Sequence, residues 1–89
     1  MKTLEKKITV FNRKGVHSRV ATKLAGIADK YNVKLAIVCH GEVVDCSSVL
    51  DVLGMSLSHG SSCTIRVSGA DPARTISAVE ALFHERNEK

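Results

Sequence analysis

Aromatic residues are scarce in this sequence, which has two phenylalanines, one tyrosine and no tryptophan among 89 residues. Phe11, Tyr31 and Phe83 are too few to line a stacking platform for single-stranded nucleic acid. The formal net charge of +4 biases encounters toward acidic partners, but no basic run with interleaved aromatics supports nucleic-acid binding. The core must therefore be built from valine, leucine, isoleucine and alanine.

Cysteines are also few, and their number and spacing give no sign of a disulfide framework or a zinc site. Cys39, Cys46 and Cys63 are odd in number and form no CxxC pair. No histidine, cysteine and carboxylate cluster has metal-ligand spacing, so we expect no metal and no cofactor. No apolar run approaches the roughly 20 residues of a membrane span, and we expect a cytoplasmic protein without membrane insertion.

The chain lacks repeats and linkers, and its one proline is Pro72, so we expect a single domain over residues 1–89. Apolar alternation predicts strands, and three- and four-residue apolar spacing predicts helices. A tight hairpin is expected at His40-Gly41. The strands are predicted over residues 6–12, 33–40, 42–46 and 63–67, and the helices from 18 to 31, over 47–57 and from 72 onward. This order, β-α-β-β-α-β-α, is typical of an α+β fold with a four-stranded antiparallel sheet and three helices on one face.

Two helix starts carry capping signals. Ser48 and Asp51 resemble a capping box in which aspartate replaces the usual glutamate. Asp71 precedes Pro72, which predicts an N-cap followed by proline at the first helical position.

The chemically most interesting residue is His17, which precedes the helical run that begins at Ser18. The first backbone amides of a helix have no intrahelical acceptor and favour an anion placed beside them. Arg19 adds a planar cation suited to phosphate oxygens. Because an imidazole nitrogen is a nucleophile near neutral pH, His17 could carry a phosphoryl group. The alternative is a histidine that does no more than occupy the cap region of the helix.

Two segments, "GVHSRVAT" at residues 15–22 and "SSVLDVLGMSLSHG" at residues 47–60, together resemble the HPr family. HPr is the histidine-containing phosphocarrier of the bacterial phosphoenolpyruvate-dependent sugar phosphotransferase system. The resemblance extends from about Lys7 to Phe83. It implies an open-faced β-sandwich, and a phosphocarrier rather than a stand-alone enzyme.

The resemblance also implies roles for individual residues. His17 would accept a phosphoryl group from phosphorylated Enzyme I and pass it to the IIA components of sugar permeases, and Arg19 would stabilise it. Partners would dock on Thr22, Val49, Leu50 and Leu53, although leucines at this spacing can equally belong to the core. Ser48 matches a serine phosphorylated by HPr kinase/phosphorylase in part of the family, and a transcriptional regulator is a further implied partner. We expect a monomer.

One position departs from the family pattern. Val20 stands where the family usually has proline, so this chain keeps a backbone amide that proline would remove. An alternative function is that of a regulatory phosphoprotein of the nitrogen-related branch, in which phosphorylation decides which partner is bound. A third alternative is an RNA-binding or acidic-surface-binding protein that uses the net positive charge. His40, His59 and His84 are expected to be turn or surface residues.

Overall fold

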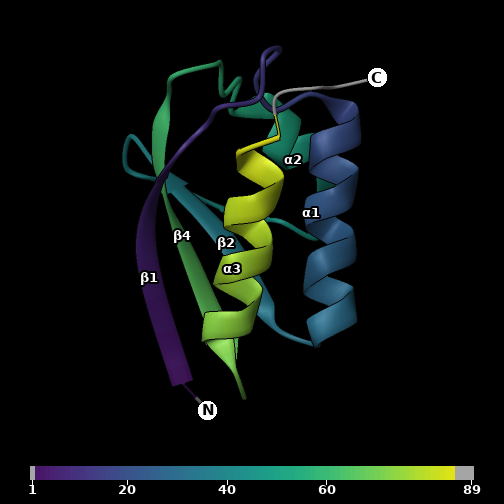
Figure 1. The fold of residues 1–89 in the computed structure, drawn as a ribbon, viewed down its shortest axis with the longest axis vertical. Coiled ribbons are helices and arrows are strands. Elements are labelled where there is room, and N and C mark those ends of the chain that lie inside the picture. Colours follow the sequence, from purple (N-terminus) through teal and green to yellow (C-terminus); the bar gives the residue numbers. More distant parts are fainter. Residues whose placement is uncertain (1, 86–89) are drawn as a thin grey trace.

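The computed structural model of the chain describes residues 2–85, which form a four-stranded antiparallel sheet and three helices. Helices α1 and α3 lie side by side over one face of the sheet, and α2 lies at one end of the molecule (Figure 1). The chain order confirms the predicted β-α-β-β-α-β-α pattern. The elements are β1 (Lys2–Thr9), α1 (Ser18–Tyr31), β2 (Lys34–Cys39), β3 (Glu42–Asp45), α2 (Val49–Gly54), β4 (Ser62–Gly69) and α3 (Pro72–Phe83).

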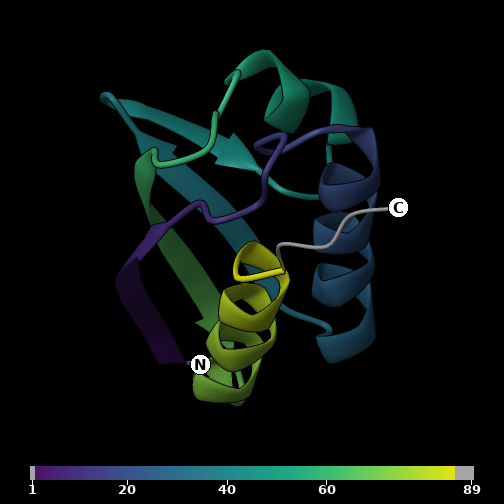
Figure 2. The same ribbon diagram turned by 45° about the horizontal axis from the view of Figure 1, so that its top comes forward.

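The strands lie in the spatial order β1-β4-β2-β3, so β4 is paired on both sides while β1 and β3 form the edges. Cys63, Ile65 and Val67 of β4 point inward and are buried, as the sequence alternation predicts. The residues between them are only partly buried, because no helix covers the other face of the sheet (Figure 2). The fold is therefore an open-faced sandwich of one sheet and one helical layer.

A single aliphatic cluster fills the space between the helices and the sheet. Phe83 is its one buried aromatic residue among those described, in keeping with the aromatic-poor composition. The buried stripe of α3 confirms the predicted helical face. Fully buried members of the cluster with no exposed surface are Val10, Ala21, Leu24, Ile37, Cys46, Val52, Ile65, Val67, Val79 and Phe83.

The first strand differs from the prediction of residues 6–12. β1 begins at Lys2 and ends at Thr9, and it pairs with β4 along its whole length, from Lys2 opposite Gly69 to Thr9 opposite Ser62. Its charged residues are tolerated because β1 is an edge strand with one solvent-facing side. Val10 and the two residues after it leave the strand and belong to the loop that leads to α1.

The N-cap residues of α2 and α3 lie where the sequence predicts, but their side chains do not form capping hydrogen bonds. Helix α2 is shorter than the predicted range of residues 47–57. Ser48 and Asp71 occupy N-cap positions, but neither side chain makes a capping hydrogen bond, so the predicted capping box is wrong. Pro72 lies in the first turn of α3, as predicted. The predicted hairpin is confirmed, since His40 and Gly41 have positive φ values of 52° and 79°.

The loop between β1 and α1 is packed directly against the segment that follows α2. The Val16 N–H donates to the Leu57 carbonyl at 2.8 Å, and Gly15 has a φ of +70°. A Cβ added to Gly15 would lie 2.8 Å from the Cα of Ser58 and closer still to the Leu57 carbonyl oxygen. Glycine is therefore required here both by its backbone conformation and by the approach of another backbone.

We predict that Gly15→Ala lowers the free energy of unfolding by about 2–4 kcal/mol, because the methyl group meets backbone that cannot move aside as a side chain could. Gly26→Ala is the matched control. It lies within α1, where an added Cβ meets nothing within 4 Å, and alanine there should leave stability equal or raise it by up to about 1 kcal/mol. Urea unfolding of both variants measures the difference, and equal effects would show that the contact is unimportant.

Candidate functional site

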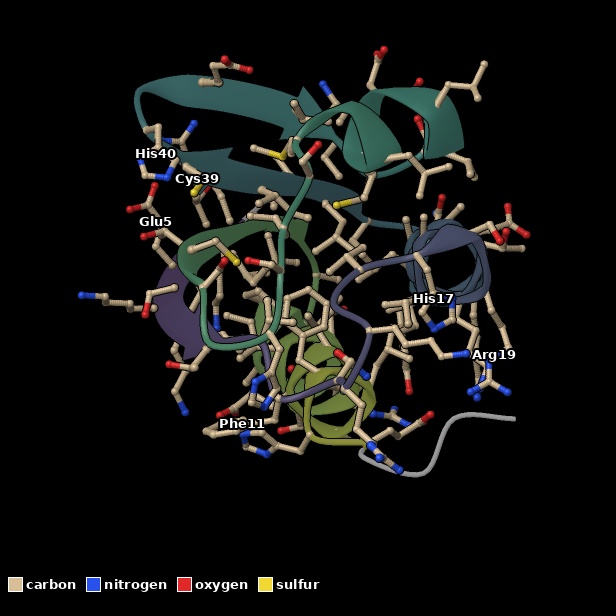
Figure 3. All side chains as sticks on the ribbon, turned by 90° about the horizontal axis from the view of Figure 1, so that it is seen from above. Glu5, Phe11, His17, Arg19, Cys39 and His40 are labelled. Atoms are coloured by element: carbon tan, nitrogen blue, oxygen red, sulfur yellow. The ribbon has the colours of Figure 1, made fainter. Side chains whose placement is uncertain are left out.

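His17 is the N-cap residue of α1. Its backbone is extended, with φ −99° and ψ −176°, and its carbonyl accepts the first hydrogen bond of the helix from the Ala21 N–H at 2.9 Å. The residue is partly exposed, at the surface where the loop from β1 meets α1. Figure 3 shows His17 and Arg19 together at this end of the helix. The predicted position of the histidine at a helix N-terminus is therefore confirmed.

The imidazole ring of His17 folds back onto the helix end. Its Nδ1 accepts a hydrogen bond from the Arg19 backbone N–H at 3.3 Å. An accepting Nδ1 carries a lone pair and no proton, so the neutral ring holds its proton on Nε2. The nitrogen that faces the helix amides is thus the nitrogen that can act as a nucleophile.

The surroundings of His17 are electrostatically positive. Residues 13–23 include Arg13, Lys14, Arg19 and Lys23 and contain no carboxylate. The first turn of α1 has no acidic residue, so nothing within the helix itself offsets the positive end of its dipole. Lys23 forms a partly exposed ion pair with Glu85, at 3.6 Å. The site favours a dianionic group beside the imidazole.

A buried asparagine that the sequence analysis did not single out holds the other end of this loop. Asn12 has no exposed surface, and its Nδ2 donates to the carbonyls of Leu82 and Glu85, each at 3.0 Å. The backbone carbonyl of Asn12 accepts a hydrogen bond from the Gly15 N–H at 2.9 Å. The loop that carries His17 is thereby attached to the end of α3. No local sequence pattern predicts that Asn12 anchors the loop, because both carbonyl acceptors lie about 70 residues away along the chain.

The four residues proposed for docking differ in exposure. Leu50 is 80% exposed, which excludes it from the core, whereas Val49 and Leu53 are half-buried and pack against the core cluster. Thr22 is exposed on α1, and its hydroxyl donates to the Ser18 carbonyl at 2.8 Å. Because α1 and α2 pack against each other, these residues belong to neighbouring surfaces of the two helices (Figure 2).

Ser48 is partly buried at the start of α2, and its hydroxyl makes no capping bond there. Its N–H donates to the Asp45 carbonyl at 3.1 Å. Hydrogen bonds from the backbone N–H and hydroxyl of Ser47 hold the pKa of Asp45 below its usual value, so this carboxylate stays charged near Ser48. Asp51 adds a second carboxylate in the first turn of α2.

The other histidines and the cysteines lie outside this constellation. His40 occupies the β2–β3 turn on the far side of the molecule from His17 in Figure 3, and His59 and His84 are exposed. All three cysteines are free and buried. Burial raises the pKa of Cys46 to about 12 and that of Cys63 to about 11, so both remain protonated thiols at neutral pH.

Residues 2–85 contain no group of three or more histidines, cysteines or carboxylates placed to hold a metal ion. No helix in this part of the chain is long and apolar enough to cross a membrane.

Comparisons with known proteins identify the family to which the chain belongs. Residues 4–85 match the family model described as the PTS HPr component phosphorylation site. The chain is 32% identical to the phosphocarrier protein HPr of Treponema pallidum over 84 residues, covering 94% of this chain and 96% of the relative. It is 33% identical to the phosphocarrier protein NPr of Shewanella violacea over 82 residues, covering 92% and 90%.

The fold is also that of solved phosphocarrier structures. The crystal structure of a phosphocarrier protein HPr from Bacillus anthracis superposes with a TM-score of 0.85 at 22% identity, covering 93% of this chain and 99% of the other. With the family model spanning nearly the whole chain and two relatives above 30% identity, the chain belongs to the HPr family, the phosphocarrier components of the phosphotransferase system.

Proposed function

We propose that the chain carries a phosphoryl group on Nδ1 of His17, which it accepts from phosphorylated Enzyme I and passes to the IIA components of sugar permeases. The observation that carries this proposal is the hydrogen bond from the Arg19 N–H to Nδ1. It directs the lone pair of the ring toward the positive end of α1, where a phosphoryl group is stabilised as soon as it arrives.

The transfer step follows from this geometry. The Nδ1 lone pair attacks phosphorus, a new N–P bond forms, and the bond between phosphorus and the donor breaks, with its electrons leaving on the donor. The ring keeps its Nε2 proton and becomes cationic beside the dianionic phosphoryl group. Arg19 and the first-turn amides of α1 lie at the end of the helix where this negative charge arrives. Reversing the same step delivers the group to the next acceptor.

We predict that the wild-type chain, incubated with phosphoenolpyruvate and Enzyme I, gains one acid-labile, base-stable phosphate. His17→Ala should lose it completely, because the substitution removes the nitrogen that faces the first turn of α1. His59→Ala, an exposed histidine in the loop before β4, is the control and should be labelled like the wild type. A labelled His17→Ala variant would contradict the proposal.

A nitrogen-related regulatory phosphoprotein remains the second candidate, supported by the 33% identity to an NPr protein, close to the 32% identity to an HPr protein. In that case phosphorylation of His17 would decide which partner is bound. The same labelling experiment carried out with the Enzyme I of each branch distinguishes the two, because the physiological donor will transfer faster at equal concentration.

Docking is proposed to use Leu50 together with Thr22, Val49 and Leu53. A leucine side chain that is 80% exposed on a six-residue helix contributes little to the fold, and burying it against a partner removes apolar surface from water. Leu50 lies on α2, which packs against α1. A partner that binds Leu50 would therefore hold its reacting group near His17 at the start of α1.

We predict that Leu50→Glu raises the apparent KM of Enzyme I for this chain about ten- to a hundredfold. Val43→Glu is the control, since Val43 is also an exposed hydrophobic residue, 57% exposed, but lies on β3. Neither variant should change the rate at which the small donor phosphoramidate phosphorylates His17. A Leu50→Glu chain with an unchanged KM would exclude Leu50 from docking.

Ser48 is proposed as a regulatory phosphorylation site for HPr kinase/phosphorylase, and the modified chain as a ligand for a transcriptional regulator. A phosphate there would join the charged Asp45 and Asp51. The added negative charge would repel an acidic partner from the α2 surface rather than unfold the helix.

We predict that Ser48→Ala abolishes ATP-dependent phosphorylation by such a kinase, whereas Ser47→Ala is modified normally. The two serines are adjacent, but the Ser47 hydroxyl is engaged with Asp45 at 2.8 Å and the Ser48 hydroxyl makes no capping bond. Phosphopeptide mass spectrometry distinguishes the sites, and a phosphate on Ser47 would contradict the assignment.

A further inference from the structure

Two of the three cysteines lie opposite each other on neighbouring strands. β2 and β4 are antiparallel, and the last pair of their register is Val38 opposite Thr64. One residue further along the same register, at the end of β2, Cys39 comes opposite Cys63. Both side chains belong to the buried face of the sheet, where 8% of Cys39 and 4% of Cys63 is exposed. Two thiols therefore lie side by side beneath the sheet.

The backbone hydrogen bonds show which kind of cross-strand pair this is. In an antiparallel sheet, the N–H and C=O of one residue face the same neighbouring strand, and those of the next residue face the other. The Leu35 carbonyl accepts from the residue that follows β3, so Leu35 and, by alternation, Cys39 face β3. The Ser61 carbonyl accepts from the residue that follows β1, so Cys63 faces β1. Cys39 and Cys63 are thus a non-hydrogen-bonded pair, the more closely spaced kind.

This spacing suits a disulfide bond. The Cα atoms of a non-hydrogen-bonded pair are about 4.5 Å apart, and those of bridged cysteines are about 4.4–6.8 Å apart. The Cys39 thiol already contacts β4, because its Sγ donates a hydrogen bond to the Ser62 carbonyl at 3.5 Å, one residue before Cys63. Burial raises the pKa of Cys63 to about 11, and the nearby Cys39 contributes to this rise. The two sulfur atoms can therefore be joined with little movement of either strand.

A small reagent can reach the Cys39 thiol. Cys39 lines a hollow of about 80 Å³ beside the β2–β3 turn, together with His40, Glu42, Gly54 and Met55. Figure 3 shows Cys39 next to His40, far from His17. Hydrogen peroxide is little larger than water, which takes up about 30 Å³ in the liquid, so the hollow has room for it. Cys39 is therefore the thiol at which oxidation begins.

We propose that Cys39 and Cys63 form an intramolecular disulfide when the chain meets a hydroperoxide. The Cys39 sulfur attacks the peroxide, the O–O bond breaks, one oxygen stays on sulfur as a sulfenic acid and the other leaves as water. The Cys63 sulfur then attacks the Cys39 sulfur, the S–O bond breaks, and the hydroxyl group leaves as water with the Cys63 proton. The two thiols lose two electrons and two protons, which the peroxide takes up.

The disulfide closes a covalent ring over residues 39–63. This ring contains β3 and α2, and therefore also Leu50. Closing it restricts the unfolded chain, whereas the folded strands keep the register that they already have. Oxidation therefore stabilises the fold and fastens the segment that bears α2 to the centre of the sheet.

The direct test treats the folded, reduced chain with hydrogen peroxide, removes the excess with catalase and blocks the remaining thiols with iodoacetamide in urea. Mass spectrometry should find one blocked thiol in place of three. A protease that cleaves after Glu42 and Asp51 puts the three cysteines in separate fragments, and those of Cys39 and Cys63 should be joined until dithiothreitol is added. Three blocked thiols, a disulfide that includes Cys46, or Cys39 carrying oxygen without a disulfide would overturn the proposal.

Two variants and the thermal stability of the chain complete the test. Cys46→Ala removes the third thiol and should form the disulfide like the wild type, whereas Cys63→Ala should form none. The oxidised wild type and oxidised Cys46→Ala should melt about 10 °C above their reduced forms, and peroxide should not raise the melting temperature of Cys63→Ala. An oxidised wild type that melts no higher than the reduced chain would show that the bond does not fit the native register. Should either variant fail to fold, the fragment map of the wild type decides alone.

Discussion

The placement of His17 depends on the backbone contact between Gly15 and the Leu57–Ser58 segment. There the Val16 N–H bonds to the Leu57 carbonyl, and the missing Cβ of Gly15 allows the two backbones to approach. Asn12 fixes the same loop to the end of α3 through two carbonyls. Because both ends of the loop are attached to the core, the loop fixes where α1 begins and therefore where the His17 side chain lies.

A carrier that transfers a group between proteins needs its reactive atom at the surface yet oriented. The partly exposed His17 meets both requirements because the Arg19 amide orients the ring without enclosing it. The neighbouring α2 presents Leu50 to solvent while Val52 is buried in the core, so a helix of only six residues is both anchored and available for contact. The proposed docking surface therefore lies on a helix that packs against α1, whose N-cap is His17, and a phosphate on Ser48 would add negative charge to that surface.

In the proposed transfer, fixed dipoles and cations stabilise the phosphoryl group, and no second side chain has to transfer a proton. The first turn of α1 lacks acidic residues, and four cations lie within residues 13–23. Such preorganised groups stabilise a phosphoryl group in transit in either direction, which suits reversible transfer.

Local patterns in the sequence predicted the order of strands and helices and the buried stripe of α3. They also predicted the His40-Gly41 turn and the position of His17 at a helix start. Each of these features depends on residues near one another in the chain. The charged residues of β1 concealed half of that strand, because only pairing with the distant β4 makes them part of the sheet. In the same way, the exposure of Leu50, the burial of Asn12 and the close contact at Gly15 depend on segments that meet only in the folded chain. The sequence by itself determined which residues could do the chemistry. Tertiary packing decided which leucine of α2 meets solvent and where the loop that carries His17 is attached, because both depend on contacts between segments far apart in the chain.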